Sequence, residues 1–218
     1  MNELVFMEYG PDAVPFTTSE VIAECAGVQH HTVTRLLRDN KADFEEFGIY
    51  GLQIHKFDGR GRPEKVYRLN EEQATLLITY LKNTPQVRAF KKELVRQFYA
   101  MRKELTKREI RRASLKPIRR NMTDAIRDYV PDSPHKSMQY VNYSNLAYQT
   151  ALGMTAKAIR RSRGADRKAN AADFLSADEL AAVERVSGHI SILLESGLSY
   201  EEVKQILTRT NQFLAEKK

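Results

Sequence analysis

Hydrophobic and polar positions change period several times over the first 83 residues, and each change predicts a new element. The apolar segment Leu4–Tyr9 favours a short strand. A helical pattern follows, and its first turn offers two caps: Ser19 alone, or Thr17 with Glu20 completing a capping box. We expect Gly27 to end this helix, because glycine adopts the left-handed backbone conformation at little steric cost.

A second helix is predicted over about Gln29–Asp39, followed by a loop around Asp43–Gly48. The period then changes from helical to two, which predicts a strand over residues 52–57. A glycine-bearing turn, Asp58–Pro63, separates this strand from another over Lys65–Leu69. Two β-rich runs joined by such a turn predict a β-hairpin.

Two further helices have clear start signals. Asn70 caps one of them with Gln73 at the third helical position, and Thr84 with Pro85 begins the next. The second of these helices carries an apolar seam at steps of three and four: Val87, Phe90, Leu94, Phe98, Met101 and Leu105. Such a seam is typical of a helix packed on its own domain and also of a dimerisation helix, and the pattern leaves both interpretations open.

The third part of the chain begins near Pro117 and has no strand signal. Shorter helical segments come first, and two capping boxes then begin the last two helices. These are Ser176 with Glu179 and Ser199 with Glu202. The pattern therefore predicts a small all-helical domain.

Three residues in the first part have the spacing of a helix-turn-helix. Ala23 is small where the two helices cross, Gly27 supplies the turn four residues later, and Val33 follows six residues beyond it. With the hairpin and third helix behind them, they indicate a winged helix-turn-helix. We expect a mainly α chain with this domain over residues 1–83, a long basic linker or dimerisation helix over 84–116, and the helical domain over 117–218.

A winged helix-turn-helix places its second helix in the major groove and its wing beside it, on phosphates or in the minor groove. The polar residues expected on that helix are Gln29, His30, His31, Thr32, Thr34, Arg35 and Arg38. Those expected on the wing are Lys56, Arg60, Arg62 and Lys65. Gln suits adenine and Arg suits guanine, because each can form two hydrogen bonds with the base edge.

Charge is distributed unevenly. Residues 1–83 hold 9 basic and 13 acidic side chains, residues 84–120 hold 13 and 3, and residues 121–218 hold 13 and 12. A domain that binds DNA alone is usually basic. Either the basic middle segment supplies the missing phosphate contacts, or the first domain binds a protein.

A second candidate basic site lies in the third part, where another helix-turn-helix pattern surrounds Gly153. Its cations are Lys157, Arg160, Arg161 and Arg163, followed by Arg167 and Lys168. Gln149 stands where a groove-reading unit needs a small residue, so the site contacts nucleic acid or is a solvated face.

Other functional classes find little support in the sequence. No apolar run approaches the roughly 18 residues of a membrane span. The adjacent His30 and His31 diverge on a helix and have no third metal ligand nearby, so no metal or cofactor is expected. Cys25 is the only cysteine and is most simply a small buried helix residue. The absence of a nucleophile elbow, phosphate-cradling loop or paired acids argues against an enzyme.

The first domain resembles the Rha family of phage regulatory proteins over about residues 14–105. The resemblance rests on these residues in this order: Thr18, Ser19, Gly27, His30, Val33, Arg35, Gly61, Arg62, Tyr67, Leu69, Leu76 and Leu77. Val28 departs from the lysine that often follows the family's glycine, which affects one phosphate contact. The C-terminal part looks like the helical tails attached to phage antirepressors.

The resemblance implies a prophage-encoded regulator in the cytoplasm of a bacterial host. Two hypotheses follow. One is a homodimeric transcriptional regulator that binds double-stranded DNA, and the other is an antirepressor that binds a phage repressor protein.

Overall fold

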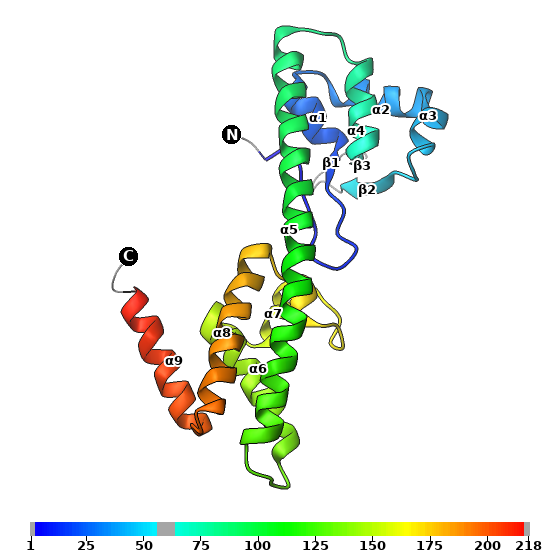
Figure 1. Cartoon of the computed structure of the whole chain (residues 1–218). Helices are drawn as coiled ribbons and strands as arrows, with labels where there is room; N and C mark the ends of the chain where they lie inside the picture. The colour runs from blue at the N-terminus through cyan, green and yellow to red at the C-terminus, as the bar shows by residue number, and fades with distance from the viewer. Residues whose placement is uncertain (1–2, 56–63, 216–218) are drawn as a thin grey trace. The chain divides into compact units, whose positions relative to one another are not determined.

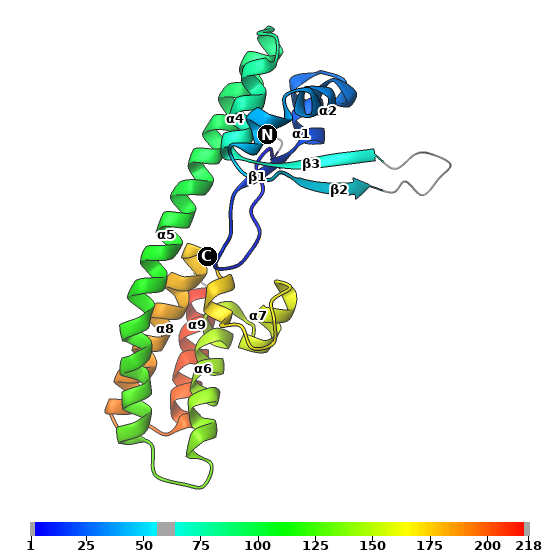
Figure 2. The ribbon, with the colours of Figure 1, turned by 90° about the vertical axis from the view of Figure 1, so that its right-hand side faces the viewer.

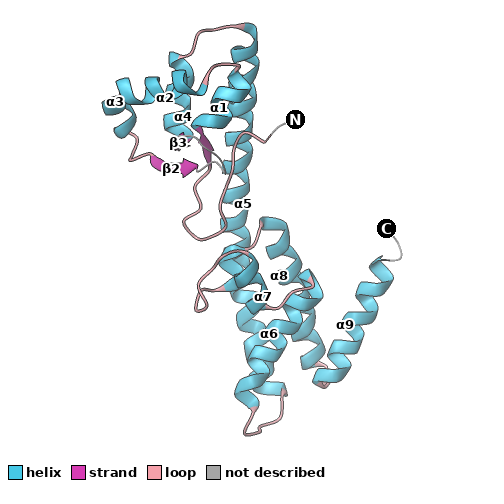
Figure 3. Cartoon of the chain, turned by 180° about the vertical axis from the view of Figure 1, so that it is seen from behind, coloured by secondary structure: helices cyan, strands magenta, loops and turns pink. Residues whose placement is uncertain are grey.

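The computed structural model describes residues 3–55 and 64–215, and it is mainly helical (Figure 3). The chain forms two compact units. Unit 1 comprises Met1–Glu8 and Asp12–Lys103, and unit 2 comprises Tyr9–Pro11 and Glu104–Lys218. The segment expected to be a separate linker, residues 84–116, is instead divided between the two units, because its apolar side chains pack into both.

Unit 1 contains a three-stranded antiparallel sheet in the order β1-β3-β2. The strands are β1 (Phe16–Thr18), β2 (Gly51–His55) and β3 (Glu64–Asn70). The predicted hairpin is present as the β2–β3 pair (Figure 2). In this pair Ile54 lies opposite Lys65.

The predicted strand over Leu4–Tyr9 is wrong. This segment makes only an isolated bridge, between Phe6 and Phe16. The backbone N–H groups of Leu4 and Val5 donate instead to Oε1 of Gln97, at 2.7 and 3.2 Å. The segment is apolar because Leu4 and Val5 are buried in the core of unit 1.

The helices of unit 1 are α1 (Ser19–Ala26), α2 (His30–Asp39), α3 (Lys41–Glu45), α4 (Glu71–Tyr80) and the beginning of α5 (Pro85–Tyr129). Figure 1 labels them along the chain. The short helix α3 occupies part of the stretch expected to be a loop. Its side chain Phe44 is fully buried, which ties the turn to the core.

Local capping signals identify the cap residues of α4 and α5 correctly and that of α1 incorrectly. Asn70 and Gln73 form the predicted capping box of α4, and Thr84 Oγ1 accepts a hydrogen bond from the N–H of Val87 in α5. At α1 the cap is Thr18, whose Oγ1 accepts from the N–H of Val21 at 3.3 Å. Both predicted caps are therefore wrong, because Ser19 and Thr17 are buried in unit 1.

The apolar seam of α5 packs inside unit 1. Val87, Phe90, Leu94 and Phe98 are at most 5% exposed and join the same core as Ile22, Leu37, Phe44 and Leu77. Met101 packs against this core, and Leu105 is half-buried. Packing on its own domain therefore explains the seam, and the seam does not require a second chain.

Unit 2 has helices and no strand among its described residues. It contains the remainder of α5, α6 (Lys136–Leu152), α7 (Ala156–Ser162), the 3-10 turn η1 (Ala171–Phe174), α8 (Ala177–Glu195) and α9 (Tyr200–Ala215). The capping box of Ser176 and Glu179 is confirmed at α8. Pro117, expected to begin this domain, lies inside α5. The buried side chains of Leu115 and Met122 on either side hold both neighbouring turns in unit 2.

Candidate nucleic-acid interface

Helices α1 and α2 are joined by a tight turn at Gly27. Gly27 has φ +66°, the left-handed conformation, and the N–H of Val28 donates to the carbonyl of Ala23 at 3.0 Å. Ala23 and Val33 are both buried where α1 meets α2. The turn therefore sets the direction in which α2 leaves α1.

Helix α2 has one buried side and one exposed side. Val33 and Leu37 are fully buried and attach it to the core. The side chains left exposed by this packing are Gln29, His31, Arg35 and Arg38. Thr32 and Thr34 are half-buried, and Thr34 Oγ1 donates to the carbonyl of His31. The predicted polar face of α2 is thus accessible, with His30 as the exception.

His30 faces the inside of the unit. Its Nε2 lies 2.9 Å from Oγ of Ser19, and the backbone N–H of Tyr67 donates to the same Oγ at 2.9 Å. Ser19, the first residue of α1, thus connects α1 to α2 and to β3. His30 consequently orients α2, although its place in the sequence predicts a residue that meets DNA.

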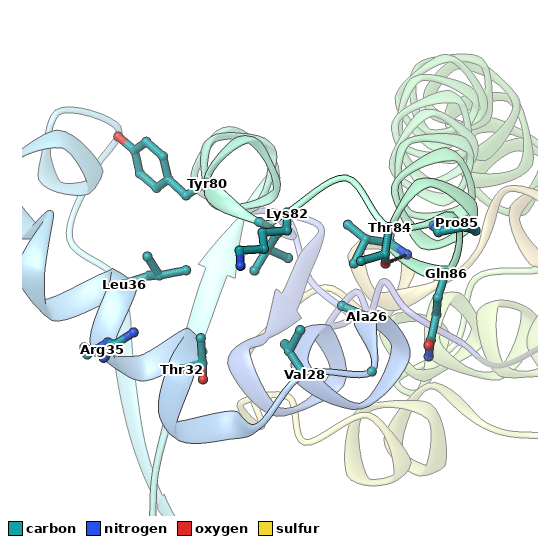
Figure 4. A pocket seen from close by; sticks show the side chains of 13 residues that line it. Ala26, Val28, Thr32, Arg35, Leu36, Tyr80, Lys82, Thr84, Pro85 and Gln86 are labelled. Carbon is teal, nitrogen blue, oxygen red and sulfur yellow. Dashed lines mark hydrogen bonds between the residues drawn. The ribbon is translucent and has the colours of Figure 1, made fainter.

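A groove runs beside the exposed side of α2, with a volume of about 650 Å³. Figure 4 shows the side chains that line it, among them Thr32, Arg35, Leu36, Lys82 and Gln86. Arg35 comes from α2, and Lys82 comes from the α4–α5 connection. No acidic residue is among the described side chains that line the groove, so it attracts anionic groups.

The hairpin supplies one described member of the predicted wing. Lys65 is exposed on β3. Lys56, Arg60 and Arg62 lie outside the residues that the structure describes.

Three acidic side chains follow α2 closely. Asp43, Glu45 and Glu46 are exposed on α3 or directly behind it. Asp39, at the last position of α2, lies 3.4 Å from Arg38, and both side chains are largely exposed, so this pair holds Arg38 weakly. The positive part of α2 is therefore bounded at its C-terminal end by carboxylates.

The second candidate basic site forms around the α6–α7 turn of unit 2. Gly153 has φ +70°, and Thr155 caps α7 by accepting from the N–H of Ala158. Lys157 and Arg161 are exposed, whereas Arg160 and Arg163 are half-buried and bonded within the unit.

Two further features bear on chemistry. Burial, and secondly the charge of Glu24, raise the pKa of the half-buried Cys25 thiol, which lowers its reactivity. Across residues 3–55 and 64–215, no group of three His, Cys, Asp or Glu side chains is placed to hold a metal ion.

Over the same residues, no helix is long and apolar enough to cross a membrane.

Comparison with known proteins bears on unit 1. Residues 17–103 match the family model described as phage regulatory protein Rha, which confirms the resemblance seen in the sequence. The matched segment ends at the last residue of unit 1 and covers less than half of the chain. No curated protein matches the chain.

Proposed function

We propose that this chain, whose residues 17–103 match the phage regulatory protein Rha family, regulates transcription by binding double-stranded DNA through a winged helix-turn-helix. One observation carries the proposal. The packing of α2 buries Val33 and Leu37 and leaves His31, Arg35 and Arg38 exposed along one side, with Gln29 exposed at the cap position before it. A helix whose apolar side chains Val33, Leu36 and Leu37 pack on the core, with polar side chains facing solvent, has what a major-groove reader needs.

Each exposed side chain has a role on duplex DNA. Arg35 suits the O6 and N7 atoms of guanine, and Gln29 suits adenine. Arg38 and Lys65 suit phosphate oxygens, which fix the register of the protein on the duplex. The exposed His31 and the half-buried Thr32 lie on the first turn of α2, where they can also contact the DNA.

The carboxylates behind α2 favour one docking orientation. Phosphates would repel Asp43, Glu45 and Glu46 if the C-terminal end of α2 approached the backbone closely. Entry of the N-terminal half of α2 into the groove keeps these groups farthest from the DNA. Recognition helices commonly contact base edges with their N-terminal residues.

The proposal is tested by selecting duplexes from a random pool with the purified full chain. We expect a recurring site, with an affinity that falls steeply as salt concentration rises. Absence of any retained duplex at low salt would refute the proposal.

A second candidate function is an antirepressor that binds a phage repressor protein. The observation that favours it is apolar exposure beside the acidic cluster: Ile49 is 92% exposed and Phe47 is 41% exposed. Exposed apolar side chains with charged neighbours are typical of protein-binding surfaces. Binding of a purified phage repressor that is lost in Ile49→Asp and unchanged in Arg35→Ala would favour this candidate.

Homodimerisation stays a prediction in both cases, and light scattering of the purified chain measures it. Action in the cytoplasm of a bacterial host is part of the same proposal, since the operator or the repressor would be found there.

A further inference from the structure

Unit 2 carries a dense group of cations around α7. Residues 153–172 contain six Lys or Arg side chains and a single acidic one, Asp166. The structure separates these six cations into two sets with different surroundings.

The first set is used inside the unit. The Nη2 atom of Arg163 donates to Oε1 of Glu179 at 2.8 Å, and its guanidinium lies 3.7 Å from the centre of the Tyr9 ring. Nη1 of Arg160 is 3.5 Å from the carbonyl oxygen of Ala169. These contacts fix the ends of the loop that follows α7.

The second set consists of the side chains left exposed: Lys157, Arg161, Arg167 and Lys168, which we call the α7 patch. None of the four has an ion pair or side-chain hydrogen bond to any described residue. Lys157 and Arg161 are one helical turn apart and share a face of α7.

The backbone beneath the α7 patch is well defined. Ile159 is fully buried and anchors α7, and the carboxylate of Asp166 accepts the backbone N–H of Lys168 at 2.7 Å. Figure 2 shows α7 and the following loop on the surface of unit 2. The four cations are therefore presented from an ordered frame, which lowers the entropy cost when they bind a ligand.

The chemistry of the α7 patch favours a phosphate backbone over a protein. No large exposed hydrophobic side chain occurs among residues 153–172, and protein interfaces normally have an apolar or aromatic centre. Phosphates need only cations. The large Gln149 in α6 stands where a groove-reading helix pair needs a small residue, so contact with the backbone is favoured over base recognition.

We propose that the α7 patch binds the phosphate backbone of duplex DNA without sequence preference, as a second DNA contact of the chain. This site does not depend on the α2 face. The chain would then combine a sequence-reading surface in unit 1 with a sequence-independent one in unit 2.

The test uses the full chain carrying Arg35→Ala and Arg38→Ala, so that the α2 face contributes little. In that background, the patch variant changes Lys157, Arg161, Arg167 and Lys168 to Gln. The matched control changes four other exposed cations of unit 2 to Gln: Lys116, Arg120, Lys204 and Arg209. Both variants remove the same charge, and circular dichroism verifies that both keep the helical fold.

Fluorescence anisotropy with a random-sequence duplex gives the affinity at several salt concentrations. We expect the patch variant to bind at least about 10-fold more weakly. The magnitude of its log–log salt slope should fall by up to about 3.6, because each of the four phosphates that a patch cation neutralises adds about 0.9 to the slope. The control should change the affinity by less than about 3-fold.

Two results would overturn the proposal: an equal fall in affinity in the two variants, or an unchanged salt slope in the patch variant. Polyglutamate that binds the α7 patch as tightly as the duplex does would overturn the assignment of the patch to DNA.

Discussion

The Oγ atom of Ser19 lies 2.9 Å from Nε2 of His30, and this contact joins the first residue of α1 to the first residue of α2. The ladder between β1 and β3 ends where Thr18 faces Arg68. The next N–H of β3, that of Tyr67, donates to the same Ser19 oxygen. One hydroxyl thus continues the sheet and sets the position of the proposed reading helix.

Ser19→Ala should lower the free energy of unfolding by about 1–3 kcal/mol, because it removes the hydroxyl of the buried Ser19 and leaves the partly buried N–H of Tyr67 without this acceptor. Urea unfolding measures this change. Thr18→Ser is the matched control, since it retains a hydroxyl at the cap of α1. If the Ser19→Ala chain were as stable as the parent chain, the hydrogen bonds of Ser19 would not contribute to the free energy of unfolding.

Gly27→Ala should destabilise unit 1 by about 1–2 kcal/mol, the cost of placing an L-residue in the left-handed conformation. A Cβ atom there would also meet the side-chain amide of Gln86, but this side chain is long, exposed and able to move. We therefore expect Gln86→Ala to restore little of the stability in the double variant, as measured by urea unfolding. Full restoration by Gln86→Ala would show that the clash, rather than the backbone conformation, dominates.

Tyr143 should make unit 2 sensitive to high pH. Burial, and secondly the neighbouring Tyr200, raise the pKa of Tyr143 to about 12, compared with about 10 in an unfolded chain. Between about pH 10 and 12 the folded state keeps a proton that the unfolded state releases, so the free energy of unfolding falls as pH rises. Unfolding measured across this range should depend less on pH in Tyr143→Phe. Ionisation of Tyr143 near pH 10 in the folded chain, followed by ultraviolet absorbance, would contradict this.

Features set by neighbouring residues could be predicted from the sequence. The capping box of Asn70 with Gln73 depends on groups within one helical turn, and so does that of Ser176 with Glu179. The cap of α1 could not be assigned in this way. Three hydroxyl residues, Thr17, Thr18 and Ser19, stand side by side, and contacts with a strand about 50 residues away decide which of them is buried.

Features that depend on distant partners could not be predicted. The seam of α5 has the same periodicity whether it packs on its own unit or on a second chain, and only the three-dimensional core distinguishes the two. The backbone of Leu4 finds its partner in Gln97, more than 90 residues away, and this removes the need for a strand.

The candidate site shows the same division. The exposed side of α2 follows from helical periodicity, so the exposure of His31, Arg35 and Arg38 could be predicted from the sequence. The inward orientation of His30 could not, because its partner Ser19 belongs to another helix. Lys82, which shares the groove with Arg35, was also missed, since it comes from the α4–α5 connection.

Arg35→Ala is the decisive variant for the proposal that the exposed side of α2 reads DNA sequence. The measured quantity is the ratio of affinities for the selected duplex and a random duplex. We expect Arg35→Ala to lower this ratio by about 5- to 150-fold, the equivalent of about 1–3 kcal/mol, with unchanged stability. Arg120→Ala, which removes an exposed arginine of unit 2, should leave the ratio within about 2-fold of the parent value. If the Arg35→Ala chain kept the parent ratio, α2 would not be the reading helix.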